Sequence, residues 1–409
     1  MILSGIVYPQ QFNTSVQNVI NEVSLANLIS TVSRLSGEKP VTIGSEEITI
    51  LSRYMNHPHN DIAADFIKQE LEGYGLDVED QYYVSSRNTL GGVGRNIIAK
   101  KLGVEYPEKK YILCAHYDSI TSNGSNAPGA DDNASGTAAV LEAARILSGY
   151  QTKYTMLFIL FDEEELGMIG SNYYANSAWS SGEEIMGVIN MDMIAFDSNS
   201  DWSCDVHTRN ISNSEALKNK MLEVNSTYSL MLNVEVHSVG TTSSDQSSFW
   251  NKSYGAILLI EDYEGSILVL YNDFNAFYHT ANDRLFAFNS LYYKAMSKLS
   301  VGTFAELAEI VTTSENNDEV VETAFLLSQN YPNPFNPSTK IVFTLPHSGY
   351  VRLTLFNILG DEIEVFIDGH MQAGSHHYNF NAKDVSSGVY FYQLLYESKA
   401  YQRKMIVAK

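Results

Sequence analysis

The stretch Ala127–Gly136, APGADDNASG, sets two adjacent acids, Asp131 and Asp132, in a loop of small residues that leads into a helical pattern. Loops of this kind often hold a phosphate, a calcium ion or a catalytic metal. A phosphate loop presents backbone N–H groups and usually a lysine, whereas two carboxylates would repel a phosphate. The charge of the loop therefore argues against phosphate and favours a cation.

Calcium is one candidate for this cation because the oxygen ligands are spaced suitably. Asp131, Asn133, Ser135, Gly136 and Glu142 fall at positions 1, 3, 5, 6 and 12 of a calcium-hand loop. Such a loop follows a helix and stays extended through its middle. Here the preceding SITSNGSNAPG is unsuited to a helix, and the following TAAVLEAARIL has a helical pattern. Calcium is therefore the weaker alternative at this loop.

A catalytic metal is the other candidate, because further ligating side chains follow predicted strands. They are His116 and Asp118 after residues 111–115, Asp162 and Glu163–Glu165 after 155–161, Asp192 after 187–191, and His279 in a loop after 256–260. Carboxylates mixed with imidazoles suit a divalent metal such as zinc. A pair of metals needs about five protein ligands with one bridging carboxylate, for which Asp131 is the natural choice.

Each of these residues also has an ordinary explanation when it is taken alone. A single His116 is more often a satisfied core or surface histidine, and Glu163–Glu165 alone would be a solvated helix start. Asp192 is harder to dismiss, because an acid after an apolar strand is costly unless it is paired or metal-bound. The combination therefore favours a metal site. The remaining candidates are interpreted as ordinary core or surface histidines; they are His57, His59, His370, His376 and His377.

The elements that would position these residues alternate between strands and helices. Short, almost continuously apolar runs predict strands covered on both faces at 111–115, 155–161, 187–191 and 256–260. Apolar stripes predict helices at 61–72, 136–147, 214–224 and 291–310. This alternation predicts an α/β fold with a mostly parallel sheet sandwiched by helices, in which ligands bind at the carboxyl ends of the strands.

Composition limits the classes of function. The formal charge of −22, without any basic run, argues against nucleic-acid binding. Two cysteines, Cys114 and Cys204, are too few for a disulfide scaffold or a thiolate metal cluster, although one bridge is conceivable. No run of about 18 apolar residues predicts a membrane span. The opening MILSGIVYPQ is too short and too polar for a secretory signal, so we expect either a cytoplasmic protein or a chain whose signal peptide has been removed.

The chain changes character near residue 320. Residues 326–409 hold seven Lys or Arg and six Asp or Glu, against 26 and 48 in the whole chain, so the acidity belongs to the first part. We expect a catalytic domain with an N-terminal helical segment at 1–312, an acidic linker at 313–325, and a C-terminal domain at 326–409. Alternating apolar residues and Gly, Asn and Asp turns predict that the last domain is a small all-β sandwich.

Five motifs in this order carry a family resemblance. AHYDS (115–119), APGADDNASG, EELGMIGS (164–171), NMDM (190–193) and YHTANDR (278–284) together resemble the co-catalytic di-zinc aminopeptidases of peptidase clan MH. The resemblance implies two Zn²⁺ per chain. Its implied ligands are His116 and Asp192 for one zinc, Glu165 and His279 for the other, and Asp131 as the bridge between them.

The resemblance also implies roles for the neighbouring acids. Glu164 would be the general base that takes a proton from the attacking water and passes it to the leaving amine. Asp118 and Asp283 would accept hydrogen bonds from His116 and His279 and so fix their tautomers. A cis peptide is implied between Asp131 and Asp132.

One stretch departs from the family pattern. Where the best-known members have a tyrosine three residues before a Ser-Asp-His triplet, this chain has TTSSDQ, residues 241–246. Thr241 stands in place of the tyrosine that helps to stabilise the oxyanion, and Gln246 replaces the histidine. The oxyanion donor is therefore unassigned, with Tyr263 or another nearby tyrosine as a candidate.

The C-terminal domain resembles a second family. LSQNYPNPFNPSTKIVFTLP, LFNILGDEIEVFIDG, SSGVYFYQL and the terminal RKMIVAK resemble the sorting domain recognised by the type IX secretion machinery of certain Gram-negative bacteria. The resemblance implies export to the medium or the cell surface. A carbohydrate-binding or adhesive β sandwich is the alternative for this domain.

Together these features predict a secreted zinc metallo-aminopeptidase that removes N-terminal residues from peptides. One alternative is a glutaminyl cyclase-like enzyme on the same scaffold, which the five-ligand set disfavours. The other is a non-catalytic surface binding protein, which the presence of Glu164 disfavours.

Overall fold

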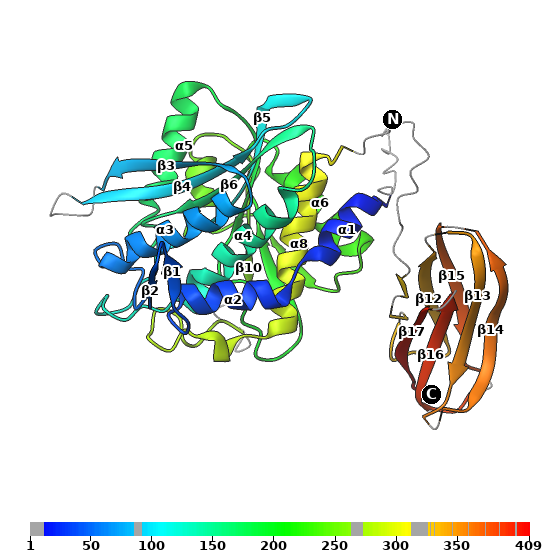
Figure 1. Cartoon of the computed structure of the whole chain (residues 1–409). Helices are drawn as coiled ribbons and strands as arrows, with labels where there is room; N and C mark the ends of the chain where they lie inside the picture. The colour runs from blue at the N-terminus through cyan, green and yellow to red at the C-terminus, as the bar shows by residue number, and fades with distance from the viewer. Residues whose placement is uncertain are drawn as a thin grey trace. The chain divides into compact units, whose positions relative to one another are not determined.

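The computed structural model describes residues 12–85, 92–262, 273–311 and 326–409, apart from positions 328, 331, 346, 359, 373, 384, 397 and 398. The chain divides into two compact units, Met1–Thr313 and Ser314–Lys409 (Figure 1). Each unit has its own hydrophobic core. The expected linker, residues 313–325, lies outside the described residues.

The first unit is built on an eight-stranded sheet. Its four central strands run parallel, and they contain the four apolar runs predicted as strands. The order is β3 (Asp77–Val84), β4 (Val93–Lys101), β6 (Tyr154–Phe161), β5 (Tyr106–His116), β7 (Glu184–Met191), β10 (Ala256–Glu261), β8 (Ser203–His207) and β9 (Asn233–His237). Strand β4 is antiparallel to β6, and β8 is antiparallel to β10. The mostly parallel sheet of the predicted fold is confirmed.

Helices accompany this sheet along the chain. They are α1 (Thr14–Glu22), α2 (Leu25–Leu35), α3 (Pro58–Gly73), α4 (Gly136–Leu147), α5 (Ile169–Ser181), α6 (Ser214–Thr227), α7 (Gln246–Trp250) and α8 (Ser290–Ala308). A two-stranded hairpin, β1 (Val41–Ile43) and β2 (Glu46–Ile48), follows α2. Within the described ranges, no helix combines the length and hydropathy needed to cross a membrane.

Strand β5 shows how the sheet is covered on both faces. Leu113 and Ala115 belong to the larger core, which also contains residues of α1, α2, α3, α4, α6 and α8. Ile112 and Cys114 point to the opposite face and belong to a core that contains residues of α5 and α7. Because successive side chains of a strand alternate between faces, a run that is apolar throughout fits a strand with helices on both sides.

The two cysteines do not form the bridge that the sequence left open. Cys114 and Cys204 are both buried and free. Cys114 packs in the core of α5 and α7, whereas Cys204 packs in the larger core.

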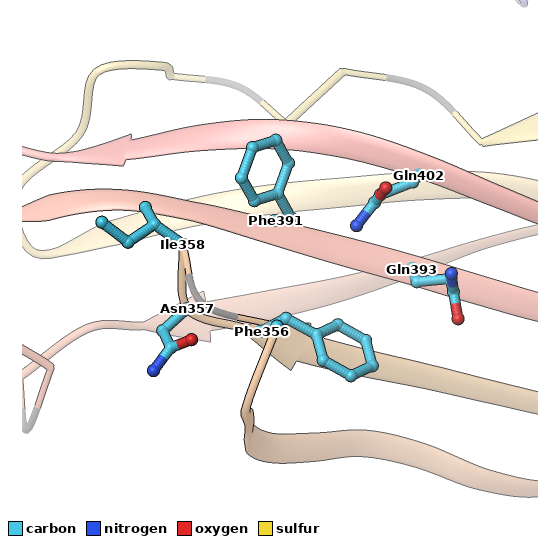
Figure 2. A pocket seen from close by; sticks show the side chains of 7 residues that line it. Phe356, Asn357, Ile358, Phe391, Gln393 and Gln402 are labelled. Atoms are coloured by element: carbon cyan, nitrogen blue, oxygen red, sulfur yellow. The ribbon is translucent and has the colours of Figure 1, made fainter.

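The second unit consists of two antiparallel sheets, which confirms the predicted all-β domain. One sheet has the order β11 (Leu326–Leu327), β12 (Ser338–Leu345) and β15 (Gly374–Asn381). The other has the order β14 (Glu362–Met371), β13 (Gly349–Phe356), β16 (Gly388–Tyr396) and β17 (Lys399–Val407). A surface hollow of about 480 Å³ in this unit is lined by Phe356, Phe391, Gln393 and Gln402 among others (Figure 2).

Candidate metal centre

The parallel strands bring the predicted ligands to one edge of the sheet. His116 is the last residue of β5 and pairs in register with Phe161, the last residue of β6. The acids of residues 162–165 follow β6 directly, and Asp192 follows β7. Because neighbouring parallel strands end at the same edge, their following residues share one site.

The first group of ligating atoms comprises His116, Asp132 and Asp192. Its ligand atoms all lie within 4.8 Å of one another, and all three residues are buried. Nε2 of His116 lies 3.3 Å from Asp192 Oδ1 and 3.4 Å from Asp132 Oδ1. Burial by itself lowers the pKa of His116. Its contacts with Asp192, Asp118 and Asp132 outweigh this effect and raise the pKa well above its usual value.

The second group comprises Asp132, Glu165 and His279. Nε2 of His279 lies 2.9 Å from Glu165 Oε2 and 3.2 Å from Asp132 Oδ2. The two oxygens of Asp132 therefore face different groups, Oδ1 toward His116 and Oδ2 toward His279. This is the arrangement of a carboxylate that bridges two metals.

In this structure Asp132, and not Asp131 as predicted, presents an oxygen to each of the two groups. Asp131 Oδ1 accepts a 3.0 Å hydrogen bond from the Ala195 N–H, and Oδ2 accepts one of 3.0 Å from Asn275 Nδ2. The backbone turns at the two acids, because Asp132, at φ −103° and ψ 92°, and Asn133, at φ −131° and ψ 48°, depart from helical geometry. The two carboxylates consequently point to different places, and Asp131 braces the loop. The cis peptide lies between Asp132 and Asn133, one bond later than expected.

Asp283 also has a different task from the one expected. Its carboxylate accepts hydrogen bonds of 3.0 Å from the backbone N–H groups of Asp131 and Asp132, and among the described residues it makes none with His279. Burial raises the pKa of Asp283 to about 7, to which the charge of Asp131 adds. Asp283 therefore holds the backbone of the loop that carries the bridging acid.

Asp118 lies beside His116, as expected, and also contacts the glutamates that follow β6. Its Oδ1 lies 3.3 Å from Nδ1 of His116. The same carboxylate accepts hydrogen bonds from the N–H groups of Glu164, at 3.0 Å, and Glu165, at 3.2 Å. One buried acid thus orients the histidine of the first group and the backbone of the glutamates that follow β6.

Glu164 stands beside the two groups without being a member of either. It is buried, and burial raises its pKa well above the usual value of a glutamate. His116 opposes this shift, while Asp245, Asp192 and Glu165 reinforce it. A carboxylate next to metal ligands, but not itself a ligand, has the placement that a general base needs.

Sequence reasoning missed Ser244 as a member of the site. Its hydroxyl donates a 2.7 Å hydrogen bond to Oδ2 of Asp192, the oxygen that does not face His116. Asn190 Nδ2 in turn donates to Ser244 Oγ at 2.8 Å. The serine lies in the TTSSDQ stretch, which was compared only for its missing tyrosine and histidine. The adjacent Ser244 and Asp245, which match the first two residues of the family's Ser-Asp-His triplet, could have indicated this role.

The two departures from the family pattern contact each other. Gln246 Nε2 donates a 2.9 Å hydrogen bond to the carbonyl of Thr241. Tyr263 lies outside the described residues. Among the described tyrosines, Tyr278 stacks on His279 with ring centroids 3.6 Å apart and is 38% exposed. Its phenol ring therefore adjoins the second group of ligating atoms.

The residues present fit a pair of cations. Burial raises the pKa of Glu165 to about 8, and the charge of Asp132 adds to this shift, while His279 and His116 oppose it. Asp132 Oδ2, Glu165 Oε1 and His279 Nε2 are buried and make no hydrogen bond within the described part of the chain. Such atoms are costly unless a partner satisfies them. Three carboxylates and two imidazoles form a donor set that suits zinc.

The calcium alternative is not supported by the geometry of the loop. Glu142, the expected twelfth-position ligand, accepts hydrogen bonds from Arg145 Nε at 2.8 Å and from the Ser24 N–H at 2.7 Å. Its carboxylate is therefore engaged by α2 and by its own helix, away from the two groups.

An α/β sandwich with carboxylates and imidazoles gathered at its strand ends is the architecture of a zinc-dependent peptidase. Residues 96–303, about half of the chain, match Peptidase family M28, and the chain belongs to that family. Residues 329–408 match the secretion system C-terminal sorting domain.

Individual relatives agree with this assignment. A "Probable zinc metalloprotease" of Pyrenophora teres f. teres is 32% identical over 198 residues, which cover 46% of this chain and 40% of the relative. The match thus spans less than half of that curated relative. The LapA aminopeptidase of Legionella pneumophila has a TM-score of 0.60 at 21% identity, covering 76% of this chain and 77% of that chain. A glutaminyl cyclase of Bacteroides thetaiotaomicron has a TM-score of 0.55 at 18% identity, covering 69% and 97%. At these identities the solved structures establish the fold.

Proposed function

We propose that this chain is a secreted aminopeptidase that uses two zinc ions and a glutamate base to remove N-terminal residues from peptides. The observation that carries the proposal is the position of Asp132, whose two oxygens face two separate sets of ligating atoms. A single-metal site would need only one of these sets.

The proposed ligand assignment follows from the two groups. His116, Asp192 and Asp132 would hold one zinc, and Glu165, His279 and Asp132 would hold the other. When bound, such a pair lowers the pKa of a shared water and polarises the scissile carbonyl.

The remaining steps belong to the protein's own side chains. Glu164 takes the proton of the attacking water and delivers it to the leaving amine, which requires an acid that is not a ligand. Asp118 keeps the Nδ1 proton of His116 in place through its carbonyl oxygen and its Oδ1, each 3.3 Å from Nδ1, so that Nε2 presents its lone pair. Ser244 holds Asp192 in the same way through its hydroxyl.

Preference for a free N-terminus fits the surplus of acids in the site. Besides the three proposed acidic ligands, Glu164, Asp118 and Asp245 are buried around the two groups. An α-ammonium group of a peptide would be attracted by this surplus, whereas an acetylated N-terminus would not.

The proposal is tested with a panel of aminoacyl p-nitroanilides, each with a free and an acetylated N-terminus. Hydrolysis of the free forms, its loss with chelator and its loss in Glu164→Ala are the expected results. Activity that survives both treatments would refute the mechanism. Cyclisation of N-terminal glutaminyl peptides with release of ammonia would favour a glutaminyl cyclase-like enzyme, and no turnover of either substrate would favour a binding protein.

We further propose that the C-terminal unit directs export through the type IX machinery of a Gram-negative bacterium, to the medium or the cell surface. The match of residues 329–408 to a sorting domain supports this. In a host that has this machinery, the full chain with a signal peptide should leave the cell, while a version without residues 326–409 should stay in the periplasm. Equal export of both versions would contradict the proposal.

A further inference from the structure

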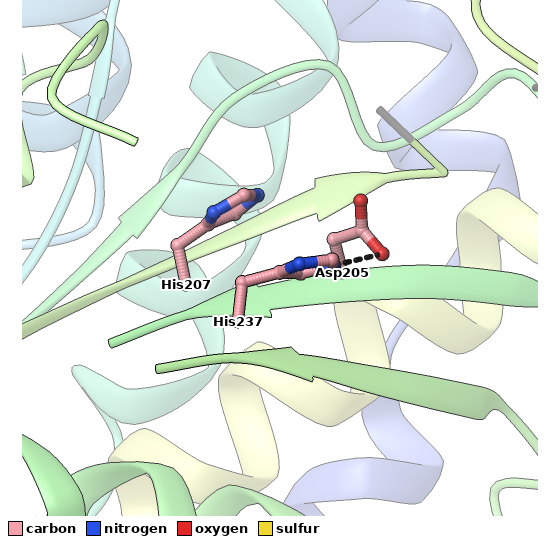
Figure 3. Close-up of side chains that lie close together, drawn as sticks. All are labelled: Asp205, His207 and His237. Carbon is pink, nitrogen blue, oxygen red and sulfur yellow. Dashed lines mark ion pairs between the residues drawn. The ribbon is translucent and has the colours of Figure 1, made fainter. Parts of the chain in front are cut away.

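A second cluster of ligating side chains lies on strands β8 and β9, at one edge of the sheet. It consists of Asp205, His207 and His237, whose ligand atoms all lie within 4.8 Å of one another (Figure 3). In the parallel pairing of the two strands, His207 stands opposite His237. Asp205 precedes His207 by two residues and therefore projects from the same face of the sheet. The cluster shares no residue with the candidate metal centre.

The three side chains lie close together on one face of the sheet. The two imidazole rings are stacked with centroids 4.7 Å apart and planes 20° apart, and both extend toward the carboxylate of Asp205 (Figure 3). Nε2 of His237 lies 3.1 Å from Asp205 Oδ1. Two ligands of one tetrahedral zinc ion are about 3.3 Å apart, since zinc–ligand bonds are roughly 2.0 to 2.1 Å long.

The cluster is largely shielded from solvent. His207 is fully buried, and the side chains of Asp205 and His237 are 2% and 15% exposed. Burial, reinforced by the neighbouring His237, lowers the pKa of His207 to about 4.

We propose that Asp205, His207 and His237 form a binding site for a divalent transition metal, of which zinc is the best fit. Two imidazoles and one carboxylate leave a fourth position for water, and they would tie the edge strand β9 to β8. A surface hollow of about 510 Å³ beside the cluster is lined by Asp205, Glu235 and Asp262, among others. Its acids attract cations and provide a route of entry. The site does not depend on the proposed peptidase activity.

Metal binding at this site has a structural consequence. The N–H of Thr241 donates a 3.2 Å hydrogen bond to Nδ1 of His207. A metal on Nε2 requires the ring proton to sit on Nδ1, so this amide has to turn away and lose one hydrogen bond. Three metal–ligand bonds outweigh that single bond. Thr241 begins the segment that reaches Ser244, which contacts Asp192 of the candidate metal centre.

The test measures zinc bound per chain on the full-length protein, after stripping with chelator, reloading with Zn²⁺ and removal of free metal. His237→Gln replaces a partly exposed ligand on an edge strand, and His370→Gln replaces an exposed histidine of the C-terminal unit as the matched control. Wild type and His370→Gln should hold one more zinc per chain than His237→Gln. Zinc should also raise the Tm of the first two by several degrees more than that of His237→Gln. Equal zinc content in all three proteins would overturn the proposal.

A second background separates this site from the peptidase centre. In His116→Ala/His279→Ala, which removes a proposed ligand from each catalytic group, one zinc should remain, and adding His237→Gln should remove it. A double variant that keeps its circular dichroism spectrum but binds no zinc would refute the new site, whatever the outcome of the peptidase assays.

Discussion

Oδ2 of Asp132 lies 3.2 Å from Nε2 of His279, and this contact ties the loop before α4 to the loop after β10. Asp132→Asn removes the negative charge that both groups share. Loss of a residue that hydrogen-bonds to a metal ligand costs about 10- to 100-fold in metal affinity or activity. Loss of a ligand that both metals share should therefore lower kcat/KM by at least about 100-fold. Zinc content should fall as well, as measured by elemental analysis.

Asp131→Asn is the matched control for this variant. Asp131 contacts Ala195 and Asn275 instead of the ligand groups, so its amide variant should retain the full zinc content. Its free energy of unfolding should fall by about 1 to 3 kcal/mol, because the substitution disturbs the hydrogen bonds that the two buried carboxylate oxygens accept. If Asp131→Asn lost zinc and Asp132→Asn kept it, the assignment of the bridge would be reversed.

Glu164→Gln should separate chemistry from metal binding. A general base contributes about 10²- to 10⁴-fold, so kcat should fall by that factor while zinc content stays at the wild-type value. Glu163→Gln tests a neighbouring buried glutamate that belongs to neither group. It should change kcat by no more than a few-fold. A Glu164→Gln enzyme with near wild-type kcat would remove the proposed base.

Ser244→Ala should weaken the first metal position without abolishing it. The variant deletes the 2.7 Å hydrogen bond to Asp192, an outer-sphere contact of the kind that costs about 10- to 100-fold in metal affinity. Competition with a graded chelator series measures this change. The neighbouring exposed Ser243→Ala should behave as wild type. Identical chelator sensitivity of the two variants would show that the contact does not support the site.

His207 should make the metal-free protein sensitive to acid. Its pKa in the folded state is about 4, below the usual 6.5, so between these values the unfolded chain binds the proton more readily. The stability is therefore present above pH 6.5 and is lost as the pH falls toward 4. From pH 7 to pH 5 the loss from this group should be about 1 to 2 kcal/mol.

Urea unfolding in the presence of chelator measures this loss. Between pH 7 and pH 5 the free energy of unfolding should fall by about 1 to 2 kcal/mol less in His207→Gln than in wild type, because glutamine does not titrate. Equal drops in both proteins would mean that His207 is not buried in its neutral form.

The central strands and the long helices could be predicted because burial on both faces leaves a strong pattern. The run Ala256–Ile260 is apolar throughout and forms part of β10. Strand β3, with the sequence DVEDQYYV, and helix α5, with IGSNYYANSAWSS, carry no comparable pattern. Their positions follow from tertiary packing, which short-range periodicity does not record.

The chemistry of the site could be predicted more fully than its geometry. The sequence identified the ligating residue types at the strand ends, and the structure brings His116, Glu165, Asp192 and His279 together. It could not decide between Asp131 and Asp132, because the choice depends on the φ and ψ angles of Asp132 and Asn133. Asp283 is a similar case. It lies beside the site, but it accepts hydrogen bonds from the loop backbone instead of from His279.

The central claim is that Asp132 bridges two zinc ions. Anomalous diffraction at the zinc edge on crystals of the zinc-loaded protein tests it most directly. The account predicts two strong peaks roughly 3.5 to 4 Å apart, one beside His116 and Asp192 and the other beside Glu165 and His279, with Asp132 between them. A single peak among these residues, or two peaks joined by Asp131, would contradict it.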